Sequence, residues 1–188
     1  MTKKEARALY KEKRLSLTVM SRDRLADLIL IEFQKLDMEI PDIVMTYAGN
    51  ETLLEYDPEL VERFCNFKNP FVGFAYPKID HQVLQAFLVD ENTTFAANKF
   101  GIEEPEDGIL TDVTDVGIVF VPLLAFDKMG YRVGYGKGYY DKFLSTANKN
   151  TLRIGFSFFE AEESISDINE FDIPLDICIT PFKTYHFN

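Results

Sequence analysis

Apolar residues recur at helical spacing in the first third of the chain. Ala6, Leu9 and Tyr10 place apolar groups on one face of a first helix. A second helix is expected to begin at Ser21, whose side chain is a good N-cap. Its apolar face consists of Leu25, Leu28, Ile29, Phe33 and Leu36. Pro41 ends the pattern, so the sequence predicts an N-terminal helical pair.

After residue 41 the pattern changes to short apolar runs separated by helical or polar segments. Strands are expected at 43–47, 71–75, 84–89, 117–121, 152–156 and 176–180. We expect the second of these to end at Pro77. Helices are expected from Asp57 and Pro58 to about residue 68, and over 139–148. This β-α-β rhythm predicts an α/β fold with a layered, mostly parallel sheet flanked by helices.

One stretch, residues 90–115, lacks periodicity and is rich in acidic residues. We interpret it as a surface loop that turns at Gly101, Pro105 and Gly108. By contrast, the run 117–121 is apolar at nearly every position, which is typical of a strand buried on both faces.

Composition limits the class of protein. The chain has 188 residues, of which 46% are hydrophobic, so one domain over residues 1–188 with a single core is expected. The net charge of −11 disfavours binding to nucleic acid or to an anionic membrane. Cys65 and Cys178 lie in apolar runs and are expected to be buried free thiols. His81 and His186 have no metal or triad spacing and are expected at the surface.

The N-terminal segment is charged throughout, and no apolar run approaches the roughly 18 residues of a membrane span. A cytoplasmic location without membrane attachment is therefore expected.

The most distinctive segment is GYRVGYGKGYYD, residues 130–141, which follows an apolar strand and leads into a helix. Alternating glycines permit positive φ and close approach of the backbone, so successive N–H groups can form a concave anion site. Lys128, Arg132 and Lys137 supply positive charge nearby. The segment predicts a nucleotide-phosphate site, and the alternative is a flexible turn with solvated basic residues. Neither the Walker A pattern nor the dinucleotide fingerprint fits it.

Residues 121–144, VPLLAFDKMGYRVGYGKGYYDKFL, closely resemble the signature of the 5-formyltetrahydrofolate cyclo-ligase family. Weaker similarities extend over nearly the whole chain. They are Lys3 with Arg7, Pro77 with Lys78, the stretch 101–105, and Phe171 with Asp172. The resemblance implies a fold like that of the group containing ribose-phosphate isomerase and the CoA transferases.

The resemblance also implies an activity. Family members use ATP and Mg²⁺ to close 5-formyltetrahydrofolate into 5,10-methenyltetrahydrofolate, through phosphorylation of the formyl oxygen. ADP and phosphate are the other products. The expected partner is a small-molecule substrate, 5-formyltetrahydrofolate with or without a polyglutamate tail, and we expect a monomer. Phosphoryl transfer of this kind depends mostly on positioning and electrostatics.

Roles follow residue by residue from the resemblance. Arg132 and Lys137 are expected to be catalytic. The expected ATP-binding residues are Lys3, Arg7, Arg132, Gly134, Gly136, Lys137, Gly138, Tyr139 and Tyr140. The expected substrate contacts are Glu51, Tyr135, Lys137 and Tyr139, with Glu55 as a rival to Glu51. Asp141 and Asp172 are expected to hold Mg²⁺, a cation that prefers one or two carboxylates together with phosphate oxygens.

Several positions have simpler interpretations. Lys3 and Arg7 lie four residues apart, so they project from the same face of a helix. The alternative is that they are solvated side chains of a basic helix and bind no ligand. The alternative role of Asp141 is a favourable interaction of its carboxylate with the dipole at the start of the helix. Tyr135 stands where some members have a basic residue, and it could stack on a pterin ring or pack. Two alternative functions also stay open: a sugar-phosphate isomerase or CoA-transferase-like enzyme, and a non-catalytic folate- or nucleotide-binding paralogue.

Overall fold

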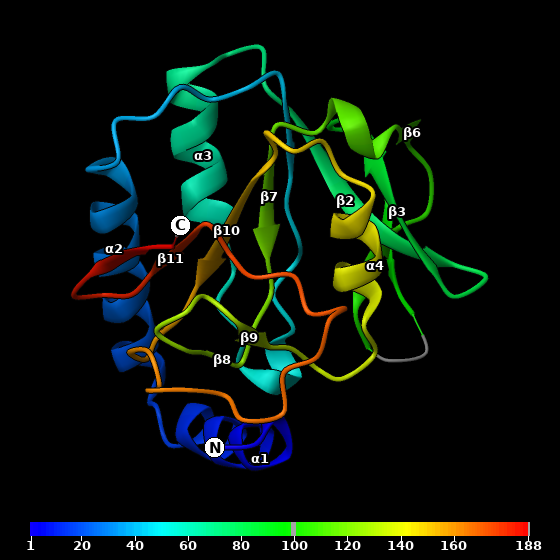
Figure 1. The fold of residues 1–188 in the computed structure, drawn as a ribbon. Helices are drawn as coiled ribbons and strands as arrows, with labels where there is room; N and C mark the ends of the chain where they lie inside the picture. The colour runs from blue at the N-terminus through cyan, green and yellow to red at the C-terminus, as the bar shows by residue number, and fades with distance from the viewer. Residues whose placement is uncertain (99–100, 188) are drawn as a thin grey trace.

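A computed structural model describes residues 1–98 and 101–187 (Figure 1). Its centre is an eight-stranded sheet in the order β12-β11-β10-β7-β1-β2-β3-β6. The inner strands run parallel to one another: β11 (Ile177–Ile179), β10 (Leu152–Phe156), β7 (Ile118–Val121), β1 (Ile43–Met45) and β2 (Gly73–Asp80). The edges are antiparallel: β12 (Thr184–His186) on one side, β3 (Val83–Leu88) and β6 (Ile109–Thr111) on the other. The predicted mostly parallel sheet is confirmed.

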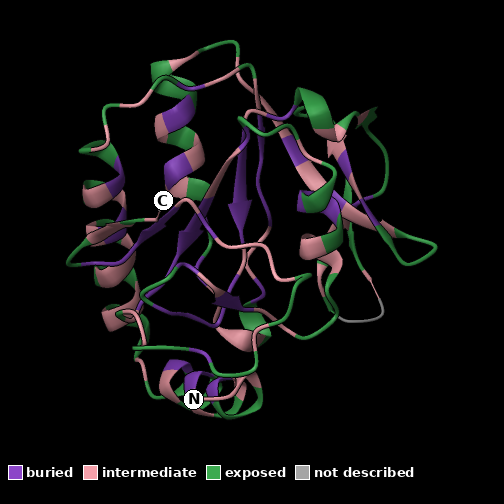
Figure 2. Ribbon diagram, viewed as in Figure 1, coloured by how far each residue is buried: buried purple, intermediate pink, exposed green. Residues whose placement is uncertain are grey.

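Side chains alternate between the two faces of the sheet. Phe120 packs in the cluster covered by α2 (Val19–Gln34) and α3 (Glu59–Lys68). Its neighbours Val119 and Val121 pack on the opposite face, in the cluster that contains the side chains of α4 (Tyr139–Ser145). All four residues of β7 are buried, as predicted for a strand covered on both sides. Figure 2 shows the resulting buried centre between exposed helix surfaces.

The first helix, α1 (Lys3–Leu15), begins with a capping box between Thr2 and Glu5. It does not lie on a face of the sheet. Its apolar side packs against the hairpin of β8 (Ala125–Phe126) and β9 (Arg132–Val133), at the end toward which β7 and β10 point (Figure 1). This places the N-terminal basic residues near the carboxyl ends of the parallel strands, where ligands of open α/β sheets usually bind.

Two predicted boundaries were wrong. Thr18, not Ser21, caps α2, because the Thr18 hydroxyl accepts the N–H of Ser21. The second strand does not end at Pro77 but runs through it. The N–H of Ile79 points away from β3 and donates to the Glu104 carboxylate. Alternate residues of a strand point their N–H groups to the same side, so the nitrogen of Pro77 also faces away from β3. The missing N–H of proline therefore costs no hydrogen bond between β2 and β3.

The acidic stretch is also more ordered than predicted. It forms β4 (Phe95–Ala97) paired with β5 (Glu103–Pro105), followed by β6 and a 3₁₀ turn at Val113–Asp115. Gly101 and Gly108 have positive φ, as expected for turns, whereas Pro105 lies in a strand. Short exposed strands of this kind lack the apolar alternation on which the prediction depended.

Other expectations were met. Both cysteines are buried and free, and both histidines are exposed, His81 within the tight turn between β2 and β3. Within residues 1–98 and 101–187, no helix is long and apolar enough to cross a bilayer.

The predicted helix over 139–148 is shorter than expected. The hydroxyls of Ser145 and Thr146 donate to the carbonyls of Lys142 and Phe143 at its end.

Candidate active site

A cavity of about 400 Å³ opens between α1, the glycine-rich segment and the carboxyl end of the sheet. It gathers residues that are up to 169 positions apart in the chain, such as Lys3 and Asp172. The predicted site residues that line it are Lys3, Arg7, Arg132, Gly134, Tyr135, Gly136, Lys137, Gly138, Tyr139, Tyr140, Asp141 and Asp172. Its apolar wall includes Pro77, Ile79, Leu84, Ile102 and Pro122.

The glycine-rich segment connects β9 to α4 along the wall of this cavity. Gly136 and Gly138 have φ of +92° and +69°, a region that favours glycine, and Gly138 is the N-cap of α4. At Gly136 a Cβ would lie 3.3 Å from the guanidinium carbon of Arg7. Arg7 in turn donates from Nε to the Gly134 carbonyl at 2.9 Å. The turn and the first helix are therefore fitted to each other.

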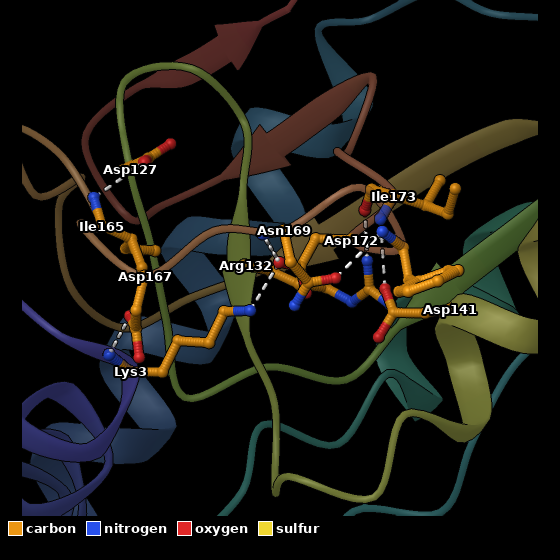
Figure 3. A network of polar contacts seen from close by, with 10 residues as sticks. Lys3, Asp127, Arg132, Asp141, Ile165, Asp167, Asn169, Asp172 and Ile173 are labelled. Carbon is orange, nitrogen blue, oxygen red and sulfur yellow. Dashed lines mark hydrogen bonds and ion pairs between the residues drawn. The ribbon is translucent and has the colours of Figure 1, made fainter.

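Two ion pairs bring cations and carboxylates together in the cavity (Figure 3). Arg132 is buried, and it donates to Asp141 at 2.9 Å and to the Ile173 carbonyl at 2.5 Å. Lys3 Nζ lies 2.5 Å from Asp172 Oδ2. Burial lowers the pKa of Arg132, and Asp141 opposes this effect, so Asp141 stabilises the charged guanidinium.

Asp127, in the Phe-Asp pair of the sequence motif, has a structural role. Its carboxylate is completely buried and accepts the N–H groups of Met129, Tyr131 and Ile165. These bonds tie the β8–β9 turn to the segment that precedes Asp172 (Figure 3). Asp127 does not line the cavity, so it shapes the site without facing it.

The floor of the cavity contains a second, separate chain of polar contacts. The Tyr135 hydroxyl donates to Glu55 Oε1 at 2.6 Å and accepts from Arg14 Nη1 at 3.0 Å. The other carboxylate oxygen of Glu55 accepts the N–H of Asn50 at 3.3 Å. Burial raises the pKa of Glu55, while Arg14 and the Tyr135 hydroxyl partly counter that rise.

Sequence reasoning had left Glu51 and Glu55 as rivals. Glu55 lines this cavity and also a second one of about 520 Å³, whereas Glu51 is exposed and lines only the second. Glu51 is the first residue of a 3₁₀ turn, Glu51–Leu53, and Leu54 in the left-handed conformation separates that turn from Glu55.

Sequence reasoning missed Arg14 and Tyr47. Arg14 is 2% exposed, and with Ala6 and Tyr10 it forms the buried stripe of α1 at intervals of four residues. Its position in that apolar stripe was the available signal. Tyr47 follows β1, is buried, and lines the cavity beside Glu55. Among the described residues, the buried hydroxyl of Tyr140 has no hydrogen-bond partner, although this residue lines the cavity.

The residues present fit a magnesium–phosphate complex better than a metal held by protein alone. The part of the chain that the structure describes has no cluster of three or more acidic, histidine or cysteine ligands. The contacts described for Asp141 use Oδ1 and those for Asp172 use Oδ2, which leaves one oxygen of each carboxylate outside these bonds. Mg²⁺ usually binds through one or two carboxylates plus phosphate oxygens and water.

Comparisons with known proteins agree with this geometry. Residues 72–181 match the model of the 5-formyltetrahydrofolate cyclo-ligase family. A Mycoplasma genitalium protein named 5-formyltetrahydrofolate cyclo-ligase is 28% identical over 77% of this chain and 82% of its own length. The Mycoplasma pneumoniae protein of that name is 25% identical over 95% and 98%. The structure of Aquifex aeolicus 5,10-methenyltetrahydrofolate synthetase is 26% identical, with a TM-score of 0.81 over 100% of this chain and 94% of that one.

Proposed function

The chain belongs to the 5-formyltetrahydrofolate cyclo-ligase family, and we infer that it converts 5-formyltetrahydrofolate to 5,10-methenyltetrahydrofolate at the expense of ATP. One observation carries the inference to this chain. A single cavity gathers four cationic side chains, the carboxylates of Asp141 and Asp172, and the half-buried Glu55, as a reaction between a nucleoside triphosphate and a neutral ring system requires. We propose that residues 1–188 form one domain for this reaction.

On the phosphate side, Lys3, Arg7, Arg132 and Lys137 would bind ATP. The chain has a net charge of −11, so its overall electrostatic field disfavours anions. These four side chains concentrate positive charge in the cavity, so an anion is favoured there. The backbone at Gly134, Gly136 and Gly138 would approach the phosphates closely, with Tyr139 and Tyr140 beside them. Arg132 and Lys137 would neutralise charge that develops during phosphoryl transfer.

Asp141 and Asp172 would hold Mg²⁺ through their second oxygens when the nucleotide is bound. The bound metal ion would neutralise part of the negative charge of the phosphates. In the chain itself, Asp141 and Asp172 hold Arg132 and Lys3, so the same carboxylates keep the phosphate-binding cations in position.

On the folate side, Glu55 replaces Glu51 in our proposal, because Glu55 lines the cavity. Tyr139 and the ring of Tyr135 would contact the substrate together with Lys137. Phosphorylation of the formyl oxygen makes it a good leaving group. The neighbouring secondary amine nitrogen of the folate, which lies outside the pterin ring, then bonds to the formyl carbon, the carbon–oxygen bond breaks, and phosphate leaves with the bonding electrons. The proton of the attacking nitrogen must pass to a base.

The test is production of the methenyl chromophore, which absorbs in the near ultraviolet. Purified protein with Mg²⁺, ATP and 5-formyltetrahydrofolate is expected to form it, and omission of ATP is expected to abolish it. No chromophore at micromolar protein would refute the proposal. An isomerase or CoA-transferase-like activity would not need the nucleotide, and a binding paralogue would give only a thermal shift with ligand. A monomeric state and a cytoplasmic location remain predictions.

A further inference from the structure

Arg14 is a buried charge with no ion-pair partner among residues 1–98 and 101–187. Its guanidinium donates to the Leu123 carbonyl and to the Tyr135 hydroxyl, while its Nε has no partner among the same residues. An arginine buried only to fill space would be costly, because desolvation of its charge is not offset by a carboxylate in contact. Packing alone therefore does not explain why an arginine occupies this buried position.

The negative group nearest to Arg14 through hydrogen bonds is Glu55. Arg14 reaches it through a single atom, the Tyr135 hydroxyl oxygen, which accepts from Arg14 and donates to Glu55. Arg14 does not line the cavity, whereas Tyr135 and Glu55 do. The chain of contacts thus runs from the buried stripe of α1 to a carboxylate that faces the ligand space.

We propose that Arg14 is a positioning residue for ring closure, which acts through Tyr135 to orient the Glu55 carboxylate and to place a positive charge one hydroxyl group away from it. This inference rests on the proposed function. Glu55 would accept the proton that the attacking nitrogen loses as the new carbon–nitrogen bond forms. The departing phosphate takes that proton afterwards as hydrogen phosphate, so Glu55 returns to its starting state.

The electrostatics around Glu55 support this role. Burial raises the pKa of this carboxyl, and Asp57 raises it further, whereas Arg14, the Tyr135 hydroxyl and the Asn50 N–H lower it. The hydroxyls of Tyr47 and Tyr140 also interact with Glu55, and burial raises their pKa values further above neutral pH, so they bring no charge. Arg14 is therefore the cation that opposes the rise in the pKa of this half-buried carboxyl.

The experiment compares the pH dependence of kcat in four variants and the wild-type chain. Arg14→Met removes the charge, Arg14→Lys restores it without the two-pronged donor, and Tyr135→Phe removes only the linking hydroxyl. Lys11→Met is the matched control, because Lys11 is an exposed lysine on the same helix. We expect the acidic limb of the profile to move up by about one pH unit in Arg14→Met and Tyr135→Phe. Arg14→Lys should recover part of that shift, and Lys11→Met should show none.

A second measurement separates positioning from general damage to α1. This helix also carries Lys3 and Arg7, so a displaced helix would raise KM for ATP, whereas loss of the relay lowers kcat near neutral pH and leaves that KM unchanged. An unshifted acidic limb in both Arg14→Met and Tyr135→Phe overturns the inference, as does a rise in KM for ATP without the shift. If Arg14→Met does not fold, Tyr135→Phe alone decides. An inactive wild-type chain would instead refute the proposed function.

Discussion

Replacing Asp141 by alanine is expected to lower the stability of the protein as well as abolish its activity. The Arg132 side chain is 5% exposed, and Asp141 supplies the carboxylate that faces it at 2.9 Å. Removing one partner of a buried ion pair leaves an unpaired charge and typically costs about 3–5 kcal/mol. Asp141 Oδ1 also accepts the Ile173 N–H, so the loss extends to the loop that carries Asp172.

Such a loss is large against a total stability of roughly 5–15 kcal/mol. For a chain of this length it lowers Tm by roughly 6–20 °C. Differential scanning fluorimetry measures the shift, and the chromophore assay, run well below the variant's Tm, measures activity per folded molecule. Asp176→Ala is the control, because it breaks the ion pair with Arg153 away from the cavity.

We expect Asp176→Ala to lower Tm yet keep wild-type activity per folded molecule, and Asp141→Ala to lose both. Asp141→Asn keeps an oxygen acceptor and should recover much of the stability without the activity. If Asp141→Ala melts within about 2 °C of the wild-type chain, the proposed coupling between Arg132 and Asp141 is wrong.

Two further predictions concern the glycine turn and a buried acid. Gly136→Ala forces a side chain into φ +92° against Arg7, so we expect about 1–2 kcal/mol of lost stability in chemical denaturation and a raised KM for ATP. Gly134→Ala, whose Cβ meets nothing within 4 Å, should leave the denaturation midpoint unchanged. Burial raises the pKa of Glu62 above 4.5, so its stabilising contribution is full below that pH and is lost as pH rises through the raised value. Glu62→Gln should therefore raise Tm at pH 8 and not at pH 5, and an equal effect at both would contradict the assignment.

Much of the fold could be predicted from local pattern. The run 117–121 identified a strand buried on both faces because every position in it is apolar, and β7 is buried at every residue. The glycine-rich segment indicated positive φ and a following helix, and Gly136 and Gly138 have that backbone. In contrast, β4, β5 and β6 have three residues each and are mostly exposed, so no apolar periodicity marked them in the sequence.

The sequence by itself determined the residue types of the site: glycines that allow a tight phosphate turn, cations to bind it, and carboxylates nearby. Only the tertiary structure decided which of them act together. It paired Arg132 with Asp141 and Lys3 with Asp172, and it turned Glu55 rather than Glu51 into the cavity. It also joined Arg14 to Glu55 through Tyr135. The physical reason is that partners of a buried charge come from elements far apart in the chain, and no local pattern records which elements meet.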